Sequence, residues 1–264
     1  MDFGLAGKKA LISGSTAGIG FAIASRLAAE QSEVIISGRT EQRVDRAIQE
    51  IKRQVPGARV SGIPGDLSRP EVALAVTDRF PDLDIVVNNL GIFEVRPFPE
   101  ISDEEWERVL QTNLFSGIRL GRYYLPRMLS RNQGRIIFIS SESALNIPKE
   151  MIHYGVTKTA QAALARGMAE LTVGSKVTVN TILAGPTLSE GAEGFIGGLA
   201  AQQKISAAEV ERHFFAEARP SSLLKRFIRP EEVADLVAFV ASDRGSAING
   251  AALRVDGGVV RSVF

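Results

Sequence analysis

The chain has 264 residues, 45% of them hydrophobic, and carries 31 basic and 30 acidic side chains, a length that suits one large α/β domain or two small ones. The balanced charge gives no electrostatic reason to expect nucleic acid or an anionic membrane as a partner, and a chain with no cysteine and only two histidines excludes disulfides and thiol catalysis and argues against a catalytic metal. Because we find neither a secretory signal pattern nor an apolar run near the ~20 residues that span a bilayer, we expect a cytoplasmic protein.

Short β-branched apolar runs alternate with amphipathic stretches along most of the chain. Strands are predicted at Ala10–Ser13, Val34–Ser37, Val60–Ile63, Ile85–Asn88, Arg135–Ser140, Val177–Leu183 and Ala252–Val255. Helices are predicted at about 18–30, 41–54, 70–80, 103–130, 152–172 and 230–242. The runs D-I-V-V-N and I-I-F-I-S are almost continuously hydrophobic, which is typical of strands covered on both faces. We therefore expect one α/β domain over residues 1–264, with a doubly wound, parallel, seven-stranded sheet and helices on both faces.

The region from 187 to 229 interrupts this alternation. It carries four glycines within residues 191–198, then an amphipathic piece around Ala207–Ala218, and no strand fits inside it. An insertion of this length is usually functional or disordered. We interpret it as a lid over a substrate; the alternative is a helical excursion with a purely structural role.

The first predicted strand leads into the glycine-rich turn S-G-S-T-A-G-I-G, residues 13–20. Its spacing is G-x-x-x-G-x-G rather than G-x-G-x-x-G. In both patterns a tight turn lets backbone N–H groups approach a pyrophosphate at the positive end of the next helix. An ordinary strand-to-helix turn is the alternative reading. The predicted cofactor contacts in this turn are Gly14, Ser15, Thr16, Gly18, Ile19 and Gly20.

The end of the second predicted strand, I-I-S-G-R-T, should select the cofactor. A carboxylate there binds the ribose 2′-hydroxyl of NAD, whereas an arginine accepts the 2′-phosphate of NADP. Gly38 stands where the acid would be, and the guanidinium of Arg39 suits phosphate oxygens. Ser37 and Thr40 could add hydroxyl donors. The sequence favours NADP over NAD, unless Arg39 is only a solvated charge at the start of the next helix.

Two other strand ends carry polar or flexible residues. In G-D-L, Asp66 or the backbone of Leu67 could meet the adenine edge, or Asp66 could cap the next helix. The motif N-N-L-G, residues 88–91, ends the fourth strand at the edge of the sheet where ligands bind. We expect Asn88 to fix neighbouring strands, and Asn89 and Gly91 to face the cofactor.

The segment H-Y-G-V-T-K places Tyr154 and Lys158 one turn apart on one face of a predicted helix. A free tyrosine has a pKa of about 10, too high for efficient proton exchange at neutral pH, and a nearby ammonium lowers that pKa. The pair fits an acid–base site, although Tyr-x-x-x-Lys is common by chance. His153 points about 100° away from Tyr154 on a helix, so we expect it at the surface or at an interface.

Two further residues strengthen this interpretation. Ser141 ends a strong strand thirteen residues upstream of Tyr154, where its hydroxyl could hold a substrate oxygen; serines also favour strand-end turns. Asn113 lies mid-helix, where asparagine is unfavourable, so it either positions a water or marks a packing kink. Glu142 either lines the pocket or is solvated.

The chain resembles the short-chain dehydrogenase/reductase family, in its 3-oxoacyl-[acyl-carrier-protein] reductase-like branch, from Lys8 to about Gly258. The resemblance lies in the order of the glycine-rich turn, Asp66, N-N-L-G, Asn113, Ser141, Tyr154 and Lys158, and in the C-terminal motifs R-P-E-E-V-A-D-L-V-A-F-V-A-S-D and L-R-V-D-G-G. It implies a Rossmann fold and a homotetramer or homodimer assembled through the helices that contain Asn113 and Tyr154.

The resemblance also implies a catalytic tetrad. Tyr154 would be the acid in reduction and the base in oxidation, and Lys158 would lower the tyrosine pKa and bind the nicotinamide ribose. Ser141 would hold the carbonyl oxygen, and Asn113 a water in a proton relay. In V-N-T-I-L-A-G-P-T-L-S, the resemblance assigns cofactor contacts to Gly185, Thr187 and Ser189, although Ala184 replaces the family's proline and Leu90 replaces the alanine of its N-N-A-G motif.

The function expected from these residues is NADP(H)-dependent reduction of a ketone or 3-oxo-type carbonyl, or oxidation of the matching secondary alcohol. An NAD-dependent alcohol dehydrogenase, a non-catalytic cofactor-binding homologue and a different chemistry on the same fold remain as alternatives. The substrate should be a small molecule in a pocket formed by residues 92–95, residues 142–147 and the predicted lid.

Overall fold

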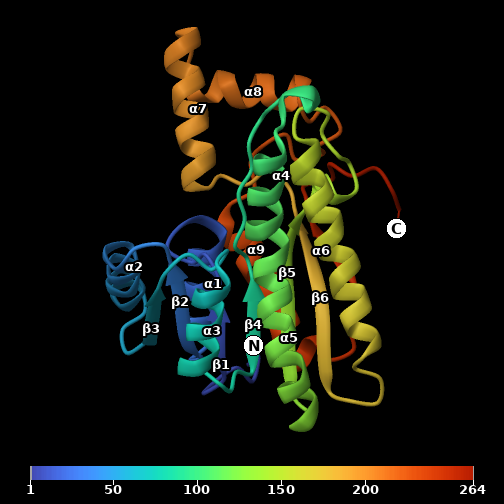
Figure 1. Cartoon of the computed structure of the whole chain (residues 1–264). Helices are drawn as coiled ribbons and strands as arrows, with labels where there is room; N and C mark the ends of the chain where they lie inside the picture. The colour runs from blue at the N-terminus through green and yellow to red at the C-terminus, as the bar shows by residue number, and fades with distance from the viewer. Residues whose placement is uncertain (1, 264) are drawn as a thin grey trace.

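Parallel strands form one continuous sheet in the computed structural model, which describes residues 2–263 except for the side chain of Phe195 (Figure 1). The strands are β1 (Lys9–Ile12), β2 (Glu33–Gly38), β3 (Arg59–Pro64), β4 (Ile85–Asn88), β5 (Gly134–Ser141), β6 (Val177–Ala184) and β7 (Ala252–Val255). Their order is β3-β2-β1-β4-β5-β6-β7, and every neighbouring pair is parallel. The chain reverses its winding between β1 and β4, where the loops after these strands diverge and leave a crevice.

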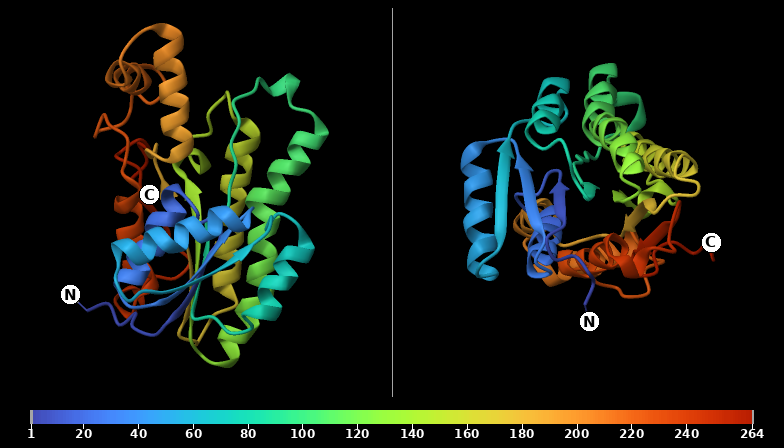
Figure 2. Two further views of the ribbon diagram at one scale, coloured as in Figure 1. Left: turned by 90° about the vertical axis from the view of Figure 1, so that its left-hand side faces the viewer. Right: turned by 90° about the horizontal axis from the view of Figure 1, so that it is seen from below.

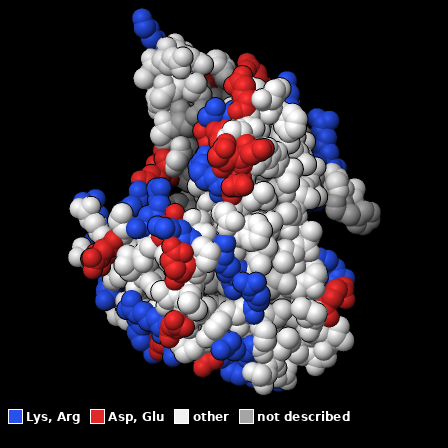
Figure 3. Space-filling view, viewed as in Figure 1, with Lys and Arg blue, Asp and Glu red and all other residues white. Residues whose placement is uncertain are grey.

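Helices cover both faces of this sheet (Figure 2). They are α1 (Gly18–Ala29), α2 (Glu41–Gln54), α3 (Pro70–Arg79), α4 (Asp103–Leu110), α5 (Ser116–Ser130), α6 (Ile152–Glu170), α7 (Glu190–Gln203), α8 (Ala207–Glu217) and α9 (Pro230–Ala241), with a π-helical turn at Gln111–Phe115 and 3₁₀ turns at Phe98–Glu100, Glu142–Ala144 and Asp243–Gly245. No helix in the described part of the chain is both long enough and apolar enough to cross a bilayer. Acidic and basic side chains are interspersed over the face shown in Figure 3.

Successive residues of each central strand enter opposite cores. Ile12 and Ile36 pack with α1, α2 and α9 on one face, whereas their neighbours Leu11 and Ile35 pack with α3, α5 and α6 on the other. This explains why these strands are nearly continuous hydrophobic runs. The predicted doubly wound, seven-stranded Rossmann-type sheet is confirmed, and each predicted strand overlaps an observed one.

Two predicted helical regions differ from the structure. The helix predicted over 103–130 is α4 and α5 joined by the π-helical turn, which contains Asn113; such turns are rare and often lie at functional sites. Helix α8 matches the amphipathic piece around Ala207–Ala218, but α7 was not predicted. Its glycines lower helix propensity by about 1 kcal/mol each, so the local pattern did not favour a helix there.

Both ends of the insertion, residues 187–229, are joined by backbone hydrogen bonds. The N–H of Leu188 donates to Ile228 O at 2.8 Å, and the N–H of Ile228 donates to Pro186 O at 2.8 Å. Between these ends α7 and α8 project beyond the carboxyl ends of the strands (Figure 1). Each begins with a serine cap, since Ser189 accepts from Ala192 N and Ser206 accepts from Glu209 N.

Candidate active site

One cavity of about 730 Å³ lies beyond the carboxyl ends of the central strands, where the strand order reverses. Ligands of open α/β sheets bind at this place. The predicted site residues that line it come from all along the chain: Gly14, Gly18, Ile19, Gly20, Arg39, Asn89, Gly91, Ser141, Tyr154, Lys158, Gly185, Thr187 and Ser189.

The glycine-rich turn is held against β4 by side chains on both sides. Ser13 Oγ accepts from the N–H groups of Asn89 and Leu90 at 2.9 Å each. Asn89 Nδ2 donates to the carbonyls of Ser13 and Gly14. A Cβ on Gly20 would lie 2.5 Å from Gly14 O, so only glycine fits this approach. These contacts keep the backbone of the turn close to the crevice.

The start of α1 makes no side-chain cap hydrogen bond, so its first backbone N–H groups are free to meet an anion at the positive end of the helix. The insertion begins directly above this end, since a Cβ on Gly18 would lie 3.2 Å from Ser189 Cβ. On the other side Gly185 passes so close to the backbone of Asp256 that an added Cβ would lie 2.7 Å from Asp256 O. The turn and its surroundings fit a dinucleotide pyrophosphate.

Asn88 does not have the predicted role. Its side chain is buried, and within the described residues neither amide atom has a hydrogen-bond partner. Asn89 makes the inter-strand contacts instead. The correction follows from the alternation of side chains along a strand, which sends adjacent residues to opposite faces.

Four predicted cofactor contacts lie outside the cavity lining. Ser15 Oγ donates to Ile12 O at 2.7 Å, and Thr16 packs against Gly38. Asp66 Oδ1 accepts from Ser68 N at 2.9 Å, and the Leu67 side chain lies in the core. The contacts of these four side chains lie within the protein, and their roles toward a cofactor stay a prediction.

The end of β2 leaves one guanidinium unengaged. Arg39 is exposed at the cavity, and in the described part of the chain it forms no hydrogen bond or ion pair. A Cβ on Gly38 would lie 2.3 Å from Thr16 Cγ2, so the acid that selects NAD could stand there only if Thr16 moved. Ser37 is buried and lies outside the cavity lining, and its Oγ accepts from Gly14 N at 3.0 Å.

The catalytic candidates come from β5 and α6. Lys158 is almost fully buried, and its Nζ donates to Ile139 O at 2.9 Å and lies 3.3 Å from Gln161 Oε1. Its Nζ lies 5.5 Å from the centre of the Tyr154 ring. Ser140 Oγ donates to Lys158 O at 2.8 Å and ties α6 to the end of β5. These bonds fix Tyr154 and Lys158 relative to Ser141.

Burial controls the ionisation of this pair. It raises the pKa of Tyr154 to about 12, an effect that a hydrogen bond with Ser141 opposes. Burial also lowers the pKa of Lys158 to about 8. Burial therefore outweighs the expected lowering of the tyrosine pKa, and Lys158 Nζ donates to Ile139 O rather than to the phenol. The phenol is protonated at neutral pH.

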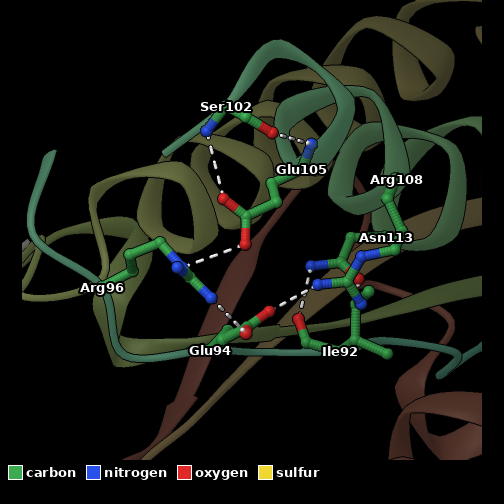
Figure 4. Close-up of polar contacts among 7 residues, drawn as sticks. All are labelled: Ile92, Glu94, Arg96, Ser102, Glu105, Arg108 and Asn113. Carbon is green, nitrogen blue, oxygen red and sulfur yellow. Dashed lines mark hydrogen bonds and ion pairs between the residues drawn. The ribbon is translucent and has the colours of Figure 1, made fainter. Parts of the chain in front are cut away.

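Asn113 is tied to its surroundings by its whole amide group (Figure 4). Its Oδ1 accepts from Ile92 N at 2.8 Å, and its Nδ2 donates to Ile92 O at 2.9 Å and to Thr157 Oγ1 at 3.0 Å. Both amide N–H groups thus have protein acceptors. Of the two predicted roles, the structure favours a packing kink that joins the loop after β4 to α6.

The loop that follows Ile92 is held by a charge network (Figure 4). Glu94 pairs with Arg96 at 3.1 Å and with Arg108 at 2.5 Å, and Arg96 reaches Glu105 at 2.9 Å. The hydrogen bonds from Arg96 and Arg108 keep the pKa of Glu94 below its ordinary value. The network places Phe93 on the cavity wall, with its ring 6.1 Å from that of Tyr154.

His153 is not at the surface of this chain. It is buried against Trp106, with the two rings 6.0 Å apart, and burial lowers its pKa. The predicted direction, away from the cavity, is consistent with its absence from the cavity lining.

The cavity lining also includes the charged residues Glu142 and Arg219. Only Glu142 was considered from the sequence. Glu142 is buried and lines the cavity, so it is not solvated. Arg219, from the loop after α8, donates from Nε to Glu142 Oε1 at 2.8 Å. No local pattern singled out Arg219, because its partner lies 77 residues away. Phe214 and Phe227 from the insertion add an apolar wall.

Comparisons with known proteins agree with this geometry. The family model described as enoyl-(acyl carrier protein) reductase matches residues 14–260. The "uncharacterized oxidoreductase YvaG" of Bacillus subtilis is 48% identical over 264 residues, all of both chains. The 3-oxoacyl-[acyl-carrier-protein] reductase FabG of Aquifex aeolicus is 32% identical over 98% of this chain and 100% of its own. The crystal structure of L-sorbose reductase from Gluconobacter frateurii with NADPH and L-sorbose has a TM-score of 0.90 at 30% identity, covering 100% of both chains.

Proposed function

Because the chain belongs to the short-chain dehydrogenase/reductase family of oxidoreductases that act on CH–OH groups, we propose that it reduces a ketone or 3-oxo-type carbonyl with NADPH, and that Tyr154 supplies the proton. The observation that carries this proposal is the shared cavity: a pyrophosphate cradle, an unengaged arginine and a protonated phenol line the same space.

The residues present fit NADP(H). The uncapped start of α1 suits the pyrophosphate, and the free guanidinium of Arg39 suits a 2′-phosphate, which it can bind in a bidentate fork. Gly38 supplies no carboxylate to select NAD. The L-sorbose reductase neighbour, which was crystallised with NADPH, supports the same choice.

When bound, NADPH supplies the hydride that adds to the carbonyl carbon. Ser141 holds the carbonyl oxygen by a hydrogen bond, and Tyr154 gives that oxygen its hydroxyl proton, which yields the alcohol and leaves a phenolate. The Lys158 ammonium, 5.5 Å from the centre of the ring, stabilises the negative charge on the phenolate. Asn113 acts as a positioning residue, because it holds Ile92 and Thr157 next to this site.

Reduction is the direction that the resting ionisation favours. A phenol whose pKa is about 12 is in the protonated form that reduction needs throughout the neutral range, whereas oxidation of an alcohol would need the phenolate. Donation of this proton then depends on groups that stabilise the phenolate as it forms. We propose that the insertion acts as a lid, because its residues Phe214 and Phe227 cover the same cavity from above. Excluding water in this way would strengthen each electrostatic interaction at the site.

We further propose a cytoplasmic homotetramer or homodimer with a small-molecule substrate. Phe115 and Val156, in the two helical regions expected at the interface, are 40% and 39% exposed in the single chain, as an association through these regions would require. Analytical ultracentrifugation would test this: a single species at the mass of one chain would contradict it.

The proposed activity is tested by the decrease of NADPH absorbance with a panel of neutral, acidic and acyl-linked ketones, with NADPH binding measured separately by fluorescence. We expect turnover with at least one ketone and a clear preference for NADPH over NADH. Tight NADPH binding with no turnover across the panel would indicate a cofactor-binding protein without this activity.

A further inference from the structure

A buried ion pair joins the insertion to the catalytic strand. Glu142 follows Ser141 directly, and its side chain is 3% exposed; that of Arg219 is 8% exposed. Arg219 Nε donates to Glu142 Oε1 at 2.8 Å, and Ser143 Oγ donates to the same oxygen at 3.2 Å. Both charged residues line the cavity that holds Tyr154.

The pair keeps unused hydrogen-bonding capacity on both sides. Glu142 Oε2 is shielded from solvent and, among the described residues, accepts no hydrogen bond. On Arg219, Nε is bonded to Glu142 and Nη1 to Ala218 O at 2.8 Å, while no bond within the described chain engages Nη2. A buried polar atom without a partner is unfavourable, so a group that both accepts and donates would complete this pair.

The charges around the pair disfavour an anion. The guanidinium of Arg219 is matched by Glu142, and Glu150 Oε1 lies 3.8 Å from Arg219 Nη1. The charge of Asp256 also disfavours further negative charge near Glu142. It raises the pKa of the Glu142 carboxyl, although burial is the larger cause. The bonds from Nε and Nη1 leave part of the Arg219 guanidinium available, but its charge is already matched by Glu142.

The pair lies close to the reacting atoms. Besides the chain adjacency of Glu142 to Ser141, the charges of Glu142 and Arg219 act in opposite directions on the ionisation of the Tyr154 phenol. The apolar side chains of Phe93, Met151 and Phe214 line the same cavity. Because Glu142 follows Ser141 directly in the chain, a polar group that reaches the pair is attached near the carbonyl and not at the far end of a long chain.

We infer that Glu142 and Arg219 form a subsite for a hydroxyl group near the reacting carbonyl, and that the preferred substrates are neutral hydroxyketones. A small rotation of the Glu142 carboxylate would turn the shielded Oε2 toward the cavity. A hydroxyl that accepts from Arg219 Nη2 then donates to this oxygen, so it satisfies both groups at once. A methyl group satisfies neither, and a carboxylate cannot donate and adds a negative charge. This inference rests on the proposed carbonyl reduction and specifies its substrate class.

Three ketones that share one carbon skeleton test the subsite in the wild-type protein: 1-hydroxy-2-pentanone, 2-pentanone and 2-oxopentanoate. We expect kcat/KM for the hydroxyketone to exceed both others by at least about tenfold, because a site built to hydrogen-bond a substrate hydroxyl rejects analogues that lack it. Equal values for the hydroxyketone and 2-pentanone, or a preference for 2-oxopentanoate, would overturn the inference.

The variant Glu142→Gln tests the residue itself, since it keeps the shape and removes the charge. We expect the preference for the hydroxyketone over 2-pentanone to fall below about threefold, mainly through a higher KM for the hydroxyketone. The ratio of the two kcat/KM values is the readout, because the Glu142 charge also acts on Tyr154 and its removal affects both ketones. The matched control is Glu193→Gln, which removes an exposed charge on α7 outside the cavity lining. A Glu142→Gln variant that binds NADPH normally and keeps the full preference would exclude Glu142 from the subsite.

The outcomes separate this inference from the proposed function. If some other ketone oxidises NADPH while none of the three compounds does, the activity stands and the hydroxyl subsite is wrong. If no ketone is reduced although NADPH binds, the proposed function itself is wrong. If Glu142→Gln does not fold, the wild-type comparison of the three ketones still decides the inference.

Discussion

Strand β5 and the residues beside it, Asn113, Tyr154 and Lys158, form what we call the catalytic floor. The floor and the insertion, residues 187–229, line the same cavity but are built differently. All eight residues of β5 are buried, and Lys158 and Asn113 beside it are held by several hydrogen bonds each. In α7, by contrast, four glycines have no neighbouring atom within 4 Å of an added Cβ. Groups that act on reacting atoms need fixed positions, whereas elements with few contacts can open and close. On this basis we propose that the chemistry takes place at the floor and that the insertion admits the substrate.

Removing the phenol hydroxyl from the floor should have the largest effect. We expect Tyr154→Phe to lower kcat by at least about 100-fold, the usual contribution of a positioned acid, and to leave NADPH binding measurable. The control is Tyr123→Phe, which deletes a hydroxyl that donates to Thr77 O far from the cavity lining. Near-normal turnover in Tyr154→Phe would show that another group supplies the proton.

Arg39 lies at the part of the cavity where we expect the cofactor. Loss of its charge-assisted hydrogen bonds to a 2′-phosphate should cost about 1.5–3 kcal/mol, so NADPH affinity in Arg39→Ala should fall by about tenfold to a hundredfold while NADH affinity stays unchanged. Arg46→Ala, an exposed arginine of α2 outside the cavity lining, is the control. Unchanged NADPH preference in Arg39→Ala would remove Arg39 from the cofactor site.

The pH dependence of reduction tests whether the Lys158 ammonium stabilises the phenolate. Lys158, whose pKa burial lowers to about 8, is an ammonium below that pH and neutral above it. Tyr154, with a pKa of about 12, stays protonated across this range. We expect kcat to fall by up to about tenfold per pH unit above pH 8 as the charge that stabilises the phenolate is lost. A rate that rises steadily from pH 7 to 10 would contradict this assignment.

A smaller effect is expected from stiffening the insertion. Gly194→Ala in α7 should stabilise that helix by about 0.5–1 kcal/mol, because the site is open and alanine is the better helix former. Hydrogen exchange in α7 should slow by about threefold, with a modest change in kcat. Gly167→Ala in α6, equally open, is the control and should leave exchange in α7 unchanged. Equal slowing in both variants would argue against an independently moving insertion.

Features that depend on local pattern were predictable from the sequence. The alternation of strands and helices, the glycine-rich turn and the one-turn spacing of Tyr154 and Lys158 all involve residues close in the chain. Several of these residues line one cavity because the sheet brings its strand ends together. The positions of Gly38 and Arg39 were also predictable, because they follow directly from the end of β2.

Features that depend on tertiary packing were not predictable. Arg219 meets Glu142 across 77 residues of chain, and the glycines of α7 concealed a helix that begins at a serine cap. The direction of the Tyr154 pKa was wrong because burial, which raises it, cannot be read from the spacing of a tyrosine and a lysine. His153 was misplaced for the same reason, since it faces Trp106 from another helix.

The most direct test of the account is the transfer of the hydride itself. The protein would be incubated with a ketone that it reduces and NADPH carrying deuterium at C4 of the nicotinamide, and the alcohol would be analysed by mass spectrometry. The account predicts one deuterium bonded to the carbinol carbon of the product in the wild-type protein and at least about 100-fold slower label transfer in Tyr154→Phe. Both hydrogens at C4 are replaced by deuterium, so that the result does not depend on which one is transferred. An alcohol product without deuterium at the carbinol carbon, or the same transfer rate in both proteins, would contradict the account.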